Sequence, residues 1–471
     1  MKQEMRDSDF HSLTIAYIGG GSRGWAWNLM GDLAREPNLG GTVRLYDIDR
    51  EAAEKNAVIG NRLTQSGVAG KWDYQVADSL AAALDGADFV IISILPGTFD
   101  EMESDVHAPE AYGIYQSVGD TVGPGGLVRA LRTIPMFVTI GQAIEQFAPE
   151  AWVINYTNPM SLCVRTLYRV FPKIKAFGCC HEVFGTQKLL ALALKEICGI
   201  EGVQRNEIQV NVLGINHFTW LDRASYKGID LFPVYDKFVQ RYKETGYVEQ
   251  QADRNWMNDS FRSAERVKMD LFSHYGLIAA AGDRHLAEFM PGWYLKNPET
   301  VREWKFGLTP VSWRKEDLKK RLARSERLVS GEESLAAEAS GEEGILLMKA
   351  LLGMGNLISN VNIPNRGQMG NLPLGAVVET NALFSRDCIA PVMAGSLPES
   401  VGALVSRHVM NQETVMKGMM EQNRETLFWA FMNDPLVSQL TPKDGRKLFY
   451  QMLENTRNYL PDWILEGIVS I

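Results

Sequence analysis

A glycine-rich turn near the start of the chain places the strongest constraint on its fold. The turn, Gly19-Gly-Gly-Ser-Arg-Gly24, follows a short apolar run at residues 14–18 and precedes a helical pattern at 25–35. An acidic residue, Asp47, comes about 20 residues later, at the end of another apolar run. A strand, such a turn, a helix and a downstream acid are the context that a dinucleotide-binding βαβ unit requires.

Three glycines of this turn each have a physical role in that unit. Gly19 permits the tight turn, Gly21 lets the backbone and Ser22 approach a pyrophosphate at the helix N-terminus, and Gly24 lets helix and strand pack closely. Asp47 is expected to accept a hydrogen bond from a ribose hydroxyl and to repel a 2′-phosphate. The turn therefore predicts NAD as the cofactor, in preference to NADP.

The first half of the chain alternates between strand and helix patterns. Predicted strands lie at residues 14–18, 43–46, 87–94, 152–154 and 176–178, with helical patterns at 25–35, 50–63 and 127–147 between them. This alternation predicts an α/β fold with a doubly wound parallel sheet. After about residue 201 the pattern becomes mixed, so we expect a Rossmann-type NAD-binding domain over residues 1–200. An α+β catalytic, substrate-binding and oligomerisation domain is expected over residues 201–471.

Composition narrows the class of protein. The chain has 471 residues and a net charge of −9, which does not favour binding to nucleic acid or to an anionic membrane surface. Its start is polar, and we expect no membrane span and no secretory signal. The five cysteines are few and odd in number, so a reducing cytoplasm is expected rather than a disulfide framework.

Three loops after predicted strands are candidates for ligand contacts. Ligands of a doubly wound sheet bind at the carboxyl ends of its strands, so Ser93, Pro96 and Asn155 are expected to line the cofactor. Asp120 and Asn158 are expected to bind substrate. For the loop at 120–126 the composition alone favours a flexible loop, although its glycines also suit an oxygen-rich ligand. Asn158-Pro159 could equally be a simple turn device.

Cys180 and His217 are the candidate metal ligands. Each follows a predicted strand, so the two side chains could meet at one edge of the sheet. A thiolate and an imidazole suit Mn²⁺, Fe²⁺, Co²⁺, Ni²⁺ or Zn²⁺, with open positions for substrate oxygens. From the residues alone, a buried cysteine and a satisfied core histidine are the commoner fates of such side chains.

Taken together, the motifs resemble those of the NAD-dependent glycoside hydrolases of family four. The resemblance spans residues 15–384. It rests on the glycine turn, on Gly123-Pro-Gly-Gly126 with Arg129-Ala-Leu-Arg-Thr-Ile-Pro135, on Asn155-Tyr-Thr-Asn-Pro159, on Cys180-His181, on Asn216-His217-Phe218, and on Asn371-Leu-Pro373 with Val378-Glu379. Their order in this chain is that of the family, and the joint match favours the metal role of Cys180 and His217.

The resemblance implies a lactate/malate-dehydrogenase-like fold, bound NAD, a divalent metal, usually Mn²⁺, and hydrolysis without net oxidation. This family lies outside the two-carboxylate mechanism of most glycosidases. The implied reaction oxidises C3 of the sugar, removes the C2 proton, eliminates the leaving group, adds water and reduces C3 again. The segment Cys180-His181-Glu182-Val183 looks most like the α-galacturonidase branch. By that resemblance His181 is the acid that protonates the leaving group.

The residue that removes the C2 proton is left open by the sequence. Phospho-glycosidase relatives use a tyrosine near the segment 283–289, and no tyrosine stands there. Asp283 and His285 are the predicted catalytic candidates in that segment. Glu288, Tyr115 and Tyr275 are the alternatives.

A substrate uronate needs a cation that offsets the desolvation of its carboxylate. Arg284 and Arg366 are the predicted candidates. The expected partners are a small oligosaccharide or uronide and other copies of the chain, as a homodimer or homotetramer. An α-glucuronidase, a neutral α-galactosidase or α-glucosidase, and, in a different class, an NAD-dependent hydroxy-acid dehydrogenase remain alternatives.

Overall fold

The computed structural model describes residues 10–248, 263–308 and 310–467. The segments 1–9 of the first predicted domain and 249–262, 309 and 468–471 of the second lie outside the described residues.

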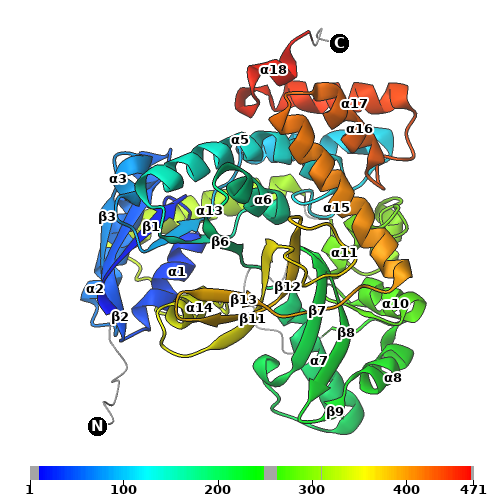
Figure 1. Ribbon diagram of the computed structural model, residues 1–471, viewed down its shortest axis with the longest axis horizontal. Helices are drawn as coiled ribbons and strands as arrows, with labels where there is room; N and C mark the ends of the chain where they lie inside the picture. Colours follow the sequence, from blue (N-terminus) through cyan, green and yellow to red (C-terminus); the bar gives the residue numbers. More distant parts are fainter. Residues whose placement is uncertain (1–9, 249–262, 309, 468–471) are drawn as a thin grey trace.

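A nine-stranded sheet forms the centre of the molecule (Figure 1). Six of its strands run parallel: β1 (Phe10–Ile18), β2 (Leu39–Tyr46), β3 (Lys71–Val76), β4 (Phe89–Ile92), β5 (Trp152–Asn155) and β6 (Lys175–Gly178). Their spatial order is β3-β2-β1-β4-β5-β6, the order of dinucleotide-binding folds. The predicted Rossmann-type sheet is therefore confirmed.

Helices cover both faces of this sheet. Helices of the first half are α1 (Trp25–Ala34), α2 (Arg50–Gln65), α3 (Leu80–Leu84), α4 (Phe99–His107), α5 (Gly123–Phe147), α6 (Met160–Val170) and α7 (Glu182–Cys198). Alternate residues of β1 belong to different cores. Ile15 and Tyr17 pack in a cluster with residues of α1 and α2, and Ala16 and Ile18 in a cluster with residues of α3, α5 and α6. This alternation is the structural basis of the doubly wound arrangement.

Three antiparallel strands extend the same sheet from the second half of the chain. They are β11 (Leu357–Pro364), β12 (Val377–Ser385) and β13 (Cys388–Pro391). The junction between β6 and β11 is narrow, because its ladder contains a single residue pair, Asn362 opposite Gly178. The sheet thus continues across the boundary that we predicted near residue 200, although the six parallel strands all precede it.

The remaining elements form a second sheet and a helical layer. The second sheet contains β7 (Gln209–Ile215), β8 (Phe218–Tyr226), β9 (Ile229–Asp230) and β10 (Ile278–Ala279). Helices of this half are α8 (Phe232–Tyr242), α10 (Arg266–Tyr275), α11 (Asp283–Phe289), α12 (Pro298–Glu303), α13 (Val311–Ser330), α14 (Gly344–Leu351), α15 (Glu399–Met420), α16 (Arg424–Asn433), α17 (Pro442–Asn455) and α18 (Asp462–Leu465). The last four helices lie together over one end of α5 (Figure 1).

Helix α5 begins earlier than the sequence indicates. Residues 123–126, which composition assigns to a flexible loop, form its buried first turn. A Cβ on Gly125 would lie 2.6 Å from the Asp105 carbonyl oxygen, and one on Gly126 would lie 2.4 Å from the Thr121 carbonyl carbon. The glycines therefore allow close packing of the helix start. Although α5 is long and apolar enough to cross a membrane, 67% of its most apolar window is buried inside the fold, as in a core helix.

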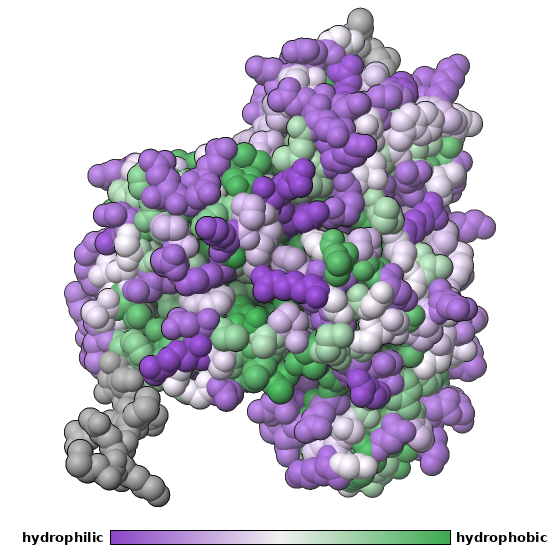
Figure 2. Space-filling view, in the orientation of Figure 1, coloured by the Kyte–Doolittle hydropathy of each residue, from purple (hydrophilic) through white to green (hydrophobic). Residues whose placement is uncertain are grey.

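One face of the surface carries apolar side chains over α14 and the added strands. Leu346 of α14, Ile358 of β11 and Met393 after β13 are exposed. Green patches interrupt the mostly hydrophilic surface of this region (Figure 2).

Candidate functional site

The glycine-rich turn packs tightly against the ends of two neighbouring strands. Gly19 has a φ of 93°, and a Cβ there would lie 2.1 Å from the Ser93 carbonyl oxygen at the end of β4. The amides of Gly19 and Gly20 both donate to the Tyr46 carbonyl oxygen at the end of β2, at 2.9 and 3.0 Å. A side chain at Gly19 would therefore be both strained and blocked, as the predicted tight turn requires.

Asp47 lies directly beside this turn. Its Oδ2 accepts a hydrogen bond of 2.8 Å from the Gly21 amide, and its Oδ1 accepts one of 2.9 Å from the Asp49 amide. Burial raises the pKa of Asp47 above its ordinary value, although both hydrogen bonds favour the carboxylate. Helix α1 begins after Gly24, and no side chain of the described residues caps its N-terminus. The open amides and the neighbouring acid fit a dinucleotide.

The loops after β4 and β5 border the same edge of the sheet. The Ile94 amide donates to Thr157 Oγ1 at 2.9 Å, and the Pro96 carbonyl accepts from Arg132 Nε at 2.9 Å. The predicted cofactor ligand Asn155 is instead fully buried. Its amide nitrogen donates to the Thr157 carbonyl and its oxygen accepts from the Thr157 amide. The Asn155 side chain thus holds its own turn, which disfavours the predicted cofactor contact.

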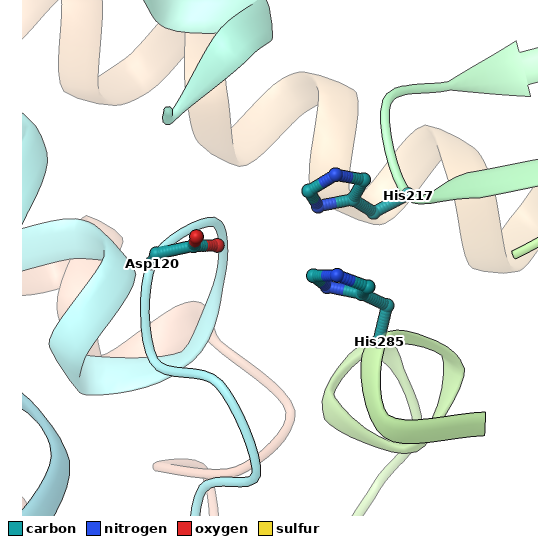
Figure 3. Close-up of side chains that lie close together, drawn as sticks. All are labelled: Asp120, His217 and His285. Atoms are coloured by element: carbon teal, nitrogen blue, oxygen red, sulfur yellow. The ribbon is translucent and has the colours of Figure 1, made fainter. Parts of the chain in front are cut away.

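Three side chains from segments far apart in the sequence, a loop, a turn between strands and the helix α11, form a compact cluster (Figure 3). One potential ligand atom from each of Asp120, His217 and His285 lies within 4.8 Å of the other two. The two imidazole rings stack with centroids 3.7 Å apart. Two histidines and one carboxylate with open positions are a common binding set for a divalent transition metal. The structure therefore joins the predicted metal ligand His217 to a predicted substrate residue and a predicted catalytic residue.

The local backbone and electrostatics suit ligand donation. His217 occupies the turn between β7 and β8 with a φ of 64°, an uncommon conformation for a residue other than glycine. Burial lowers the pKa of His217 to about 3 and also lowers that of His285, so both rings are neutral near pH 7. Burial alone would raise the pKa of Asp120, yet the two imidazoles and Arg129 hold it below its ordinary value. Neutral imidazoles and a carboxylate are the ligating forms.

A hydrogen-bonded shell supports this cluster. Thr121 Oγ1 lies 2.6 Å from an oxygen of Asp120 and 2.9 Å from His217 Nδ1. Asn158 Nδ2 donates to the other oxygen of Asp120 at 3.1 Å, and the Asn158 carbonyl accepts from Arg129 Nε. Asn158 therefore lies beside the cluster, and its predicted role in substrate binding stays a prediction. Such supporting bonds fix the orientation of metal ligands.

Cys180 and His181 lie next to this cluster rather than within it. The Cys180 thiol is not a member of the group, and burial, with Glu379 and Glu182, raises its pKa well above the usual range. His181 Nδ1 lies 2.9 Å from Glu342 Oε1. Desolvation of the ring is outweighed by Glu342, which raises the pKa of His181 to about 9. A protonated imidazole suits the acid role that the family resemblance implies.

Two buried or half-buried carboxylates near Cys180, Glu182 and Glu379, were given no role in the sequence analysis, but the structure places them in contact with residues of the candidate site. Glu182 Oε2 accepts from the Gly282 amide at 2.6 Å, and its Oε1 lies 3.7 Å from His285 Nε2. Glu379 is buried on β12 and accepts from Asn216 and Asn360, while burial raises its pKa to about 7. Both acids lie in motifs of the family resemblance, which was the available signal.

Two of the predicted active-site residues, Asp283 and Arg284, form hydrogen bonds with backbone groups of neighbouring segments. Asp283 accepts the amides of Val267 and Lys268 at 3.1 and 3.0 Å and so caps the start of α10. Arg284 donates through Nε to the Gly307 carbonyl and through Nη2 to the Ser117 carbonyl. These bonds disfavour the predicted role of Asp283 as a base. They also favour a bracing role for Arg284 over a carboxylate clamp.

Arg366 lies away from the cluster. Strand β11 runs antiparallel to β6 from the Asn362–Gly178 pair, so the residues after it approach the amino end of β6. There the Arg366 guanidinium interacts with the Tyr168 hydroxyl, which donates to the Ala176 carbonyl. The cluster instead borders the carboxyl ends of the parallel strands. This placement disfavours the prediction that Arg366 grips the substrate.

Two of the alternative bases, Tyr275 and Glu288, contact structural neighbours outside the cluster. Tyr275 packs edge-on against Trp220 in the core. Glu288 accepts the amides of Val118 and Gly119 through one oxygen and so supports the loop that carries Asp120; burial raises its pKa to about 8. His285 is the predicted base that lies within the cluster itself.

We expect Gly21→Ala to weaken NAD binding by about tenfold or more while the fold survives. The new Cβ would lie 2.7 Å from the Ala52 Cβ and 2.9 Å from Asp47 Oδ2, so the turn and the acid must separate. Calorimetric titration with NAD⁺ measures the affinity. Gly185→Ala, at an open helical position with nothing within 4 Å, is the matched control. Equal affinities of the two variants would contradict this role of the turn.

Comparisons with known proteins agree with this geometry. The family model of the family 4 glycosyl hydrolases matches residues 14–196, and that of their C-terminal domain matches residues 212–437. An α-galacturonidase of Thermoanaerobacterium saccharolyticum is 66% identical over 463 residues, which cover 98% of this chain and 99% of the relative.

Two solved structures superpose over almost the whole chain. The crystal structure of lplD from Bacillus subtilis is 54% identical with a TM-score of 0.90, over 94% of this chain and 100% of that one. A 6-phospho-α-glucosidase from gut microorganisms, solved in complex with NAD and Mn²⁺, is 20% identical with a TM-score of 0.79, over 96% and 99%. With the two family models covering most of its length, the chain belongs to family 4 of the glycosyl hydrolases.

Proposed function

We propose that this enzyme hydrolyses α-linked galacturonides with the help of NAD and a divalent metal. The full-length identity of 66% to an α-galacturonidase carries the substrate assignment. The cluster of Asp120, His217 and His285, in a fold that also has a dinucleotide-type turn, supports the chemistry. This combination also disfavours a simple hydroxy-acid dehydrogenase, which needs no metal cluster.

The residues of the cluster fit a metal ion. Within the described chain His285 Nδ1 is buried without a hydrogen-bond partner, and both imidazoles are neutral. We assign Asp120, His217 and His285 as the ligands, with Cys180 as the neighbouring thiol predicted from the sequence. Nitrogen and carboxylate donors suit Mn²⁺, which a solved relative contains. When bound, the metal would polarise sugar oxygens and NAD would accept a hydride.

The chain's own residues perform the remaining steps. His181, held by Glu342, is the proposed donor of a proton to the leaving glycosidic oxygen. Asn158 and Thr121 keep the proposed ligand Asp120 in place, and Glu182 Oε1 lies 3.7 Å from Nε2 of the proposed ligand His285. The glycine turn and Asp47 are the proposed holders of the dinucleotide.

Neither of the two predicted arginines is well placed to bind the uronate carboxylate of the substrate. Arg284 donates to backbone carbonyls, and Arg366 interacts with Tyr168 away from the cluster, so we expect a different cation to bind it. Arg314 of α13 is the better candidate. Burial lowers its pKa, and its guanidinium interacts electrostatically with Asp120 and Arg129. It therefore lies close enough to the cluster to attract an anionic substrate.

We expect the enzyme to prefer nitrophenyl α-galacturonide over nitrophenyl α-galactoside, and Arg314→Gln to reduce kcat/KM for the galacturonide by about 10- to 100-fold. The galactoside should be affected far less, because it lacks the carboxylate. Arg366→Gln is the control. Efficient cleavage of the galactoside, with no advantage for the galacturonide, would reject the substrate assignment in favour of a neutral glycosidase; a preference for glucuronides would favour an α-glucuronidase.

The oligomeric state and the cellular location rest on the sequence alone. A homodimer or homotetramer and a cytoplasmic location stay predictions. The exposed residues Leu346, Ile358 and Met393 offer one apolar surface for subunit contacts.

A further inference from the structure

The connection between α13 and α14 crosses the start of the nucleotide-binding half. We call residues 331–343 the strap; they form no helix or strand. The Ser340 amide and hydroxyl both bond to the Asp32 carboxylate of α1, at 2.8 and 2.5 Å. Arg35 Nη1 donates to the Ala337 carbonyl, and a Cβ on Gly31 would lie 2.9 Å from the Glu338 carbonyl oxygen. The strap is therefore pinned along α1.

The end of the strap is fixed a second time. Glu343 is buried, and its two oxygens bond to Arg205 at 2.8 Å and to the Ser359 hydroxyl at 2.5 Å. The Arg205 guanidinium lies 3.8 Å from the centroid of the Phe184 ring in α7. These contacts tie the strap to the helix that follows Cys180-His181.

Glu342 lies between these two anchors. Its amide donates to Ser340 Oγ at 3.0 Å, and its side chain is only 15% exposed, whereas that of His181 is 53% exposed. The carboxylate, held by the anchored strap, is thus the enclosed partner of the pair, and the imidazole is the exposed one. With Nδ1 bound to Glu342 at 2.9 Å, Nε2 is the ring nitrogen left for the substrate.

We propose that Glu342 is a positioning residue that aims His181 Nε2 at the glycosidic oxygen. This inference rests on the proposed function. In the step concerned, the Nε2 proton moves to the glycosidic oxygen as the C1–O bond breaks and its electron pair goes to that oxygen. The imidazole is left neutral, and Glu342 is unchanged. An isolated exposed ion pair would contribute little, but the anchored strap makes the orientation of this one specific.

The test compares two leaving groups. A sugar alkoxide needs a proton to leave, whereas nitrophenolate is stable enough to need little assistance. We expect Glu342→Ala to reduce kcat/KM for di-galacturonide by about tenfold or more, and for nitrophenyl α-galacturonide by less than about threefold. Glu342→Gln, whose side-chain oxygen can still accept a hydrogen bond from Nδ1–H, should recover part of the loss. Glu338→Ala, at an exposed glutamate of the same strap, is the matched control.

The outcomes are distinguishable. Equal losses on both substrates, or no loss on either, would overturn the positioning role. Affinities for NAD⁺ and Mn²⁺, measured by calorimetry on the same variants, should be unchanged, and a parallel fall in either would show that Glu342 is merely structural. If the unmutated enzyme cleaves neither galacturonide, the proposed function fails instead, before any variant is compared.

Discussion

Replacement of His217 by alanine is expected to abolish Mn²⁺ binding and hydrolysis while NAD binding survives. His217 supplies one of three clustered ligand atoms, and the turn that carries it is separate from the glycine-rich turn. Loss of a direct ligand should cost more than the 10- to 100-fold typical of supporting residues. Titration of Mn²⁺ followed by electron paramagnetic resonance, with parallel calorimetry for NAD⁺, measures both effects.

His274→Ala is the control for this experiment, because His274 is an exposed histidine of α10. Cys180→Ser tests the other predicted ligand. A matching loss of Mn²⁺ affinity would place the thiolate in the coordination sphere, and unchanged affinity would restrict the ligands to the clustered three. Full activity of metal-free His217→Ala protein would refute the metal site.

Hydrolysis should require NAD⁺ without consuming it. In the mechanism implied by the family resemblance, hydride leaves C3 and returns to C3, while the C2 proton is exchanged with solvent. A galacturonide deuterated at C2 and hydrolysed in ordinary water should therefore lose its label, and one deuterated at C3 should keep it. Mass spectrometry of the released sugar distinguishes the two positions.

Enzyme freed of NAD serves as the control and should be inactive until NAD⁺ is restored. Retention of the C2 label through complete hydrolysis would argue for direct displacement at C1. Steady accumulation of NADH in proportion to substrate would instead indicate a dehydrogenase.

The Rossmann-type half could be predicted from sequence because its signals are local. The apolar run of β1, the turn that begins at Gly19 and the acid Asp47 are close together in the chain and have fixed roles in a βαβ unit. Helix α5 was predicted to begin too late, since its glycine-rich first turn depends on contacts with the backbone of Asp105 and Thr121. Those contacts are tertiary and leave no periodic pattern.

The candidate site was less predictable for the same reason. Asp120, His217 and His285 come from a loop, a turn between two strands and a short helix, and only the fold shows that they share one point in space. Asp283 is next to Arg284 and His285 in sequence, but its carboxylate caps α10. Neighbouring polar residues on a short helix point in different directions, so proximity in sequence could not separate a cap from a ligand.

The single residue pair between β6 and β11 gives the large sheet a weak line. Six parallel strands with their own helices lie on one side, and three antiparallel strands on the other. Local opening along this line would disturb the surroundings of Cys180, whose carbonyl accepts a bond from Asn360 of β11. The six-stranded part would keep its hydrogen-bond ladders. Amide exchange should therefore be faster at this junction than within β1 or β4, so that the two halves of one continuous sheet behave as separate cooperative units.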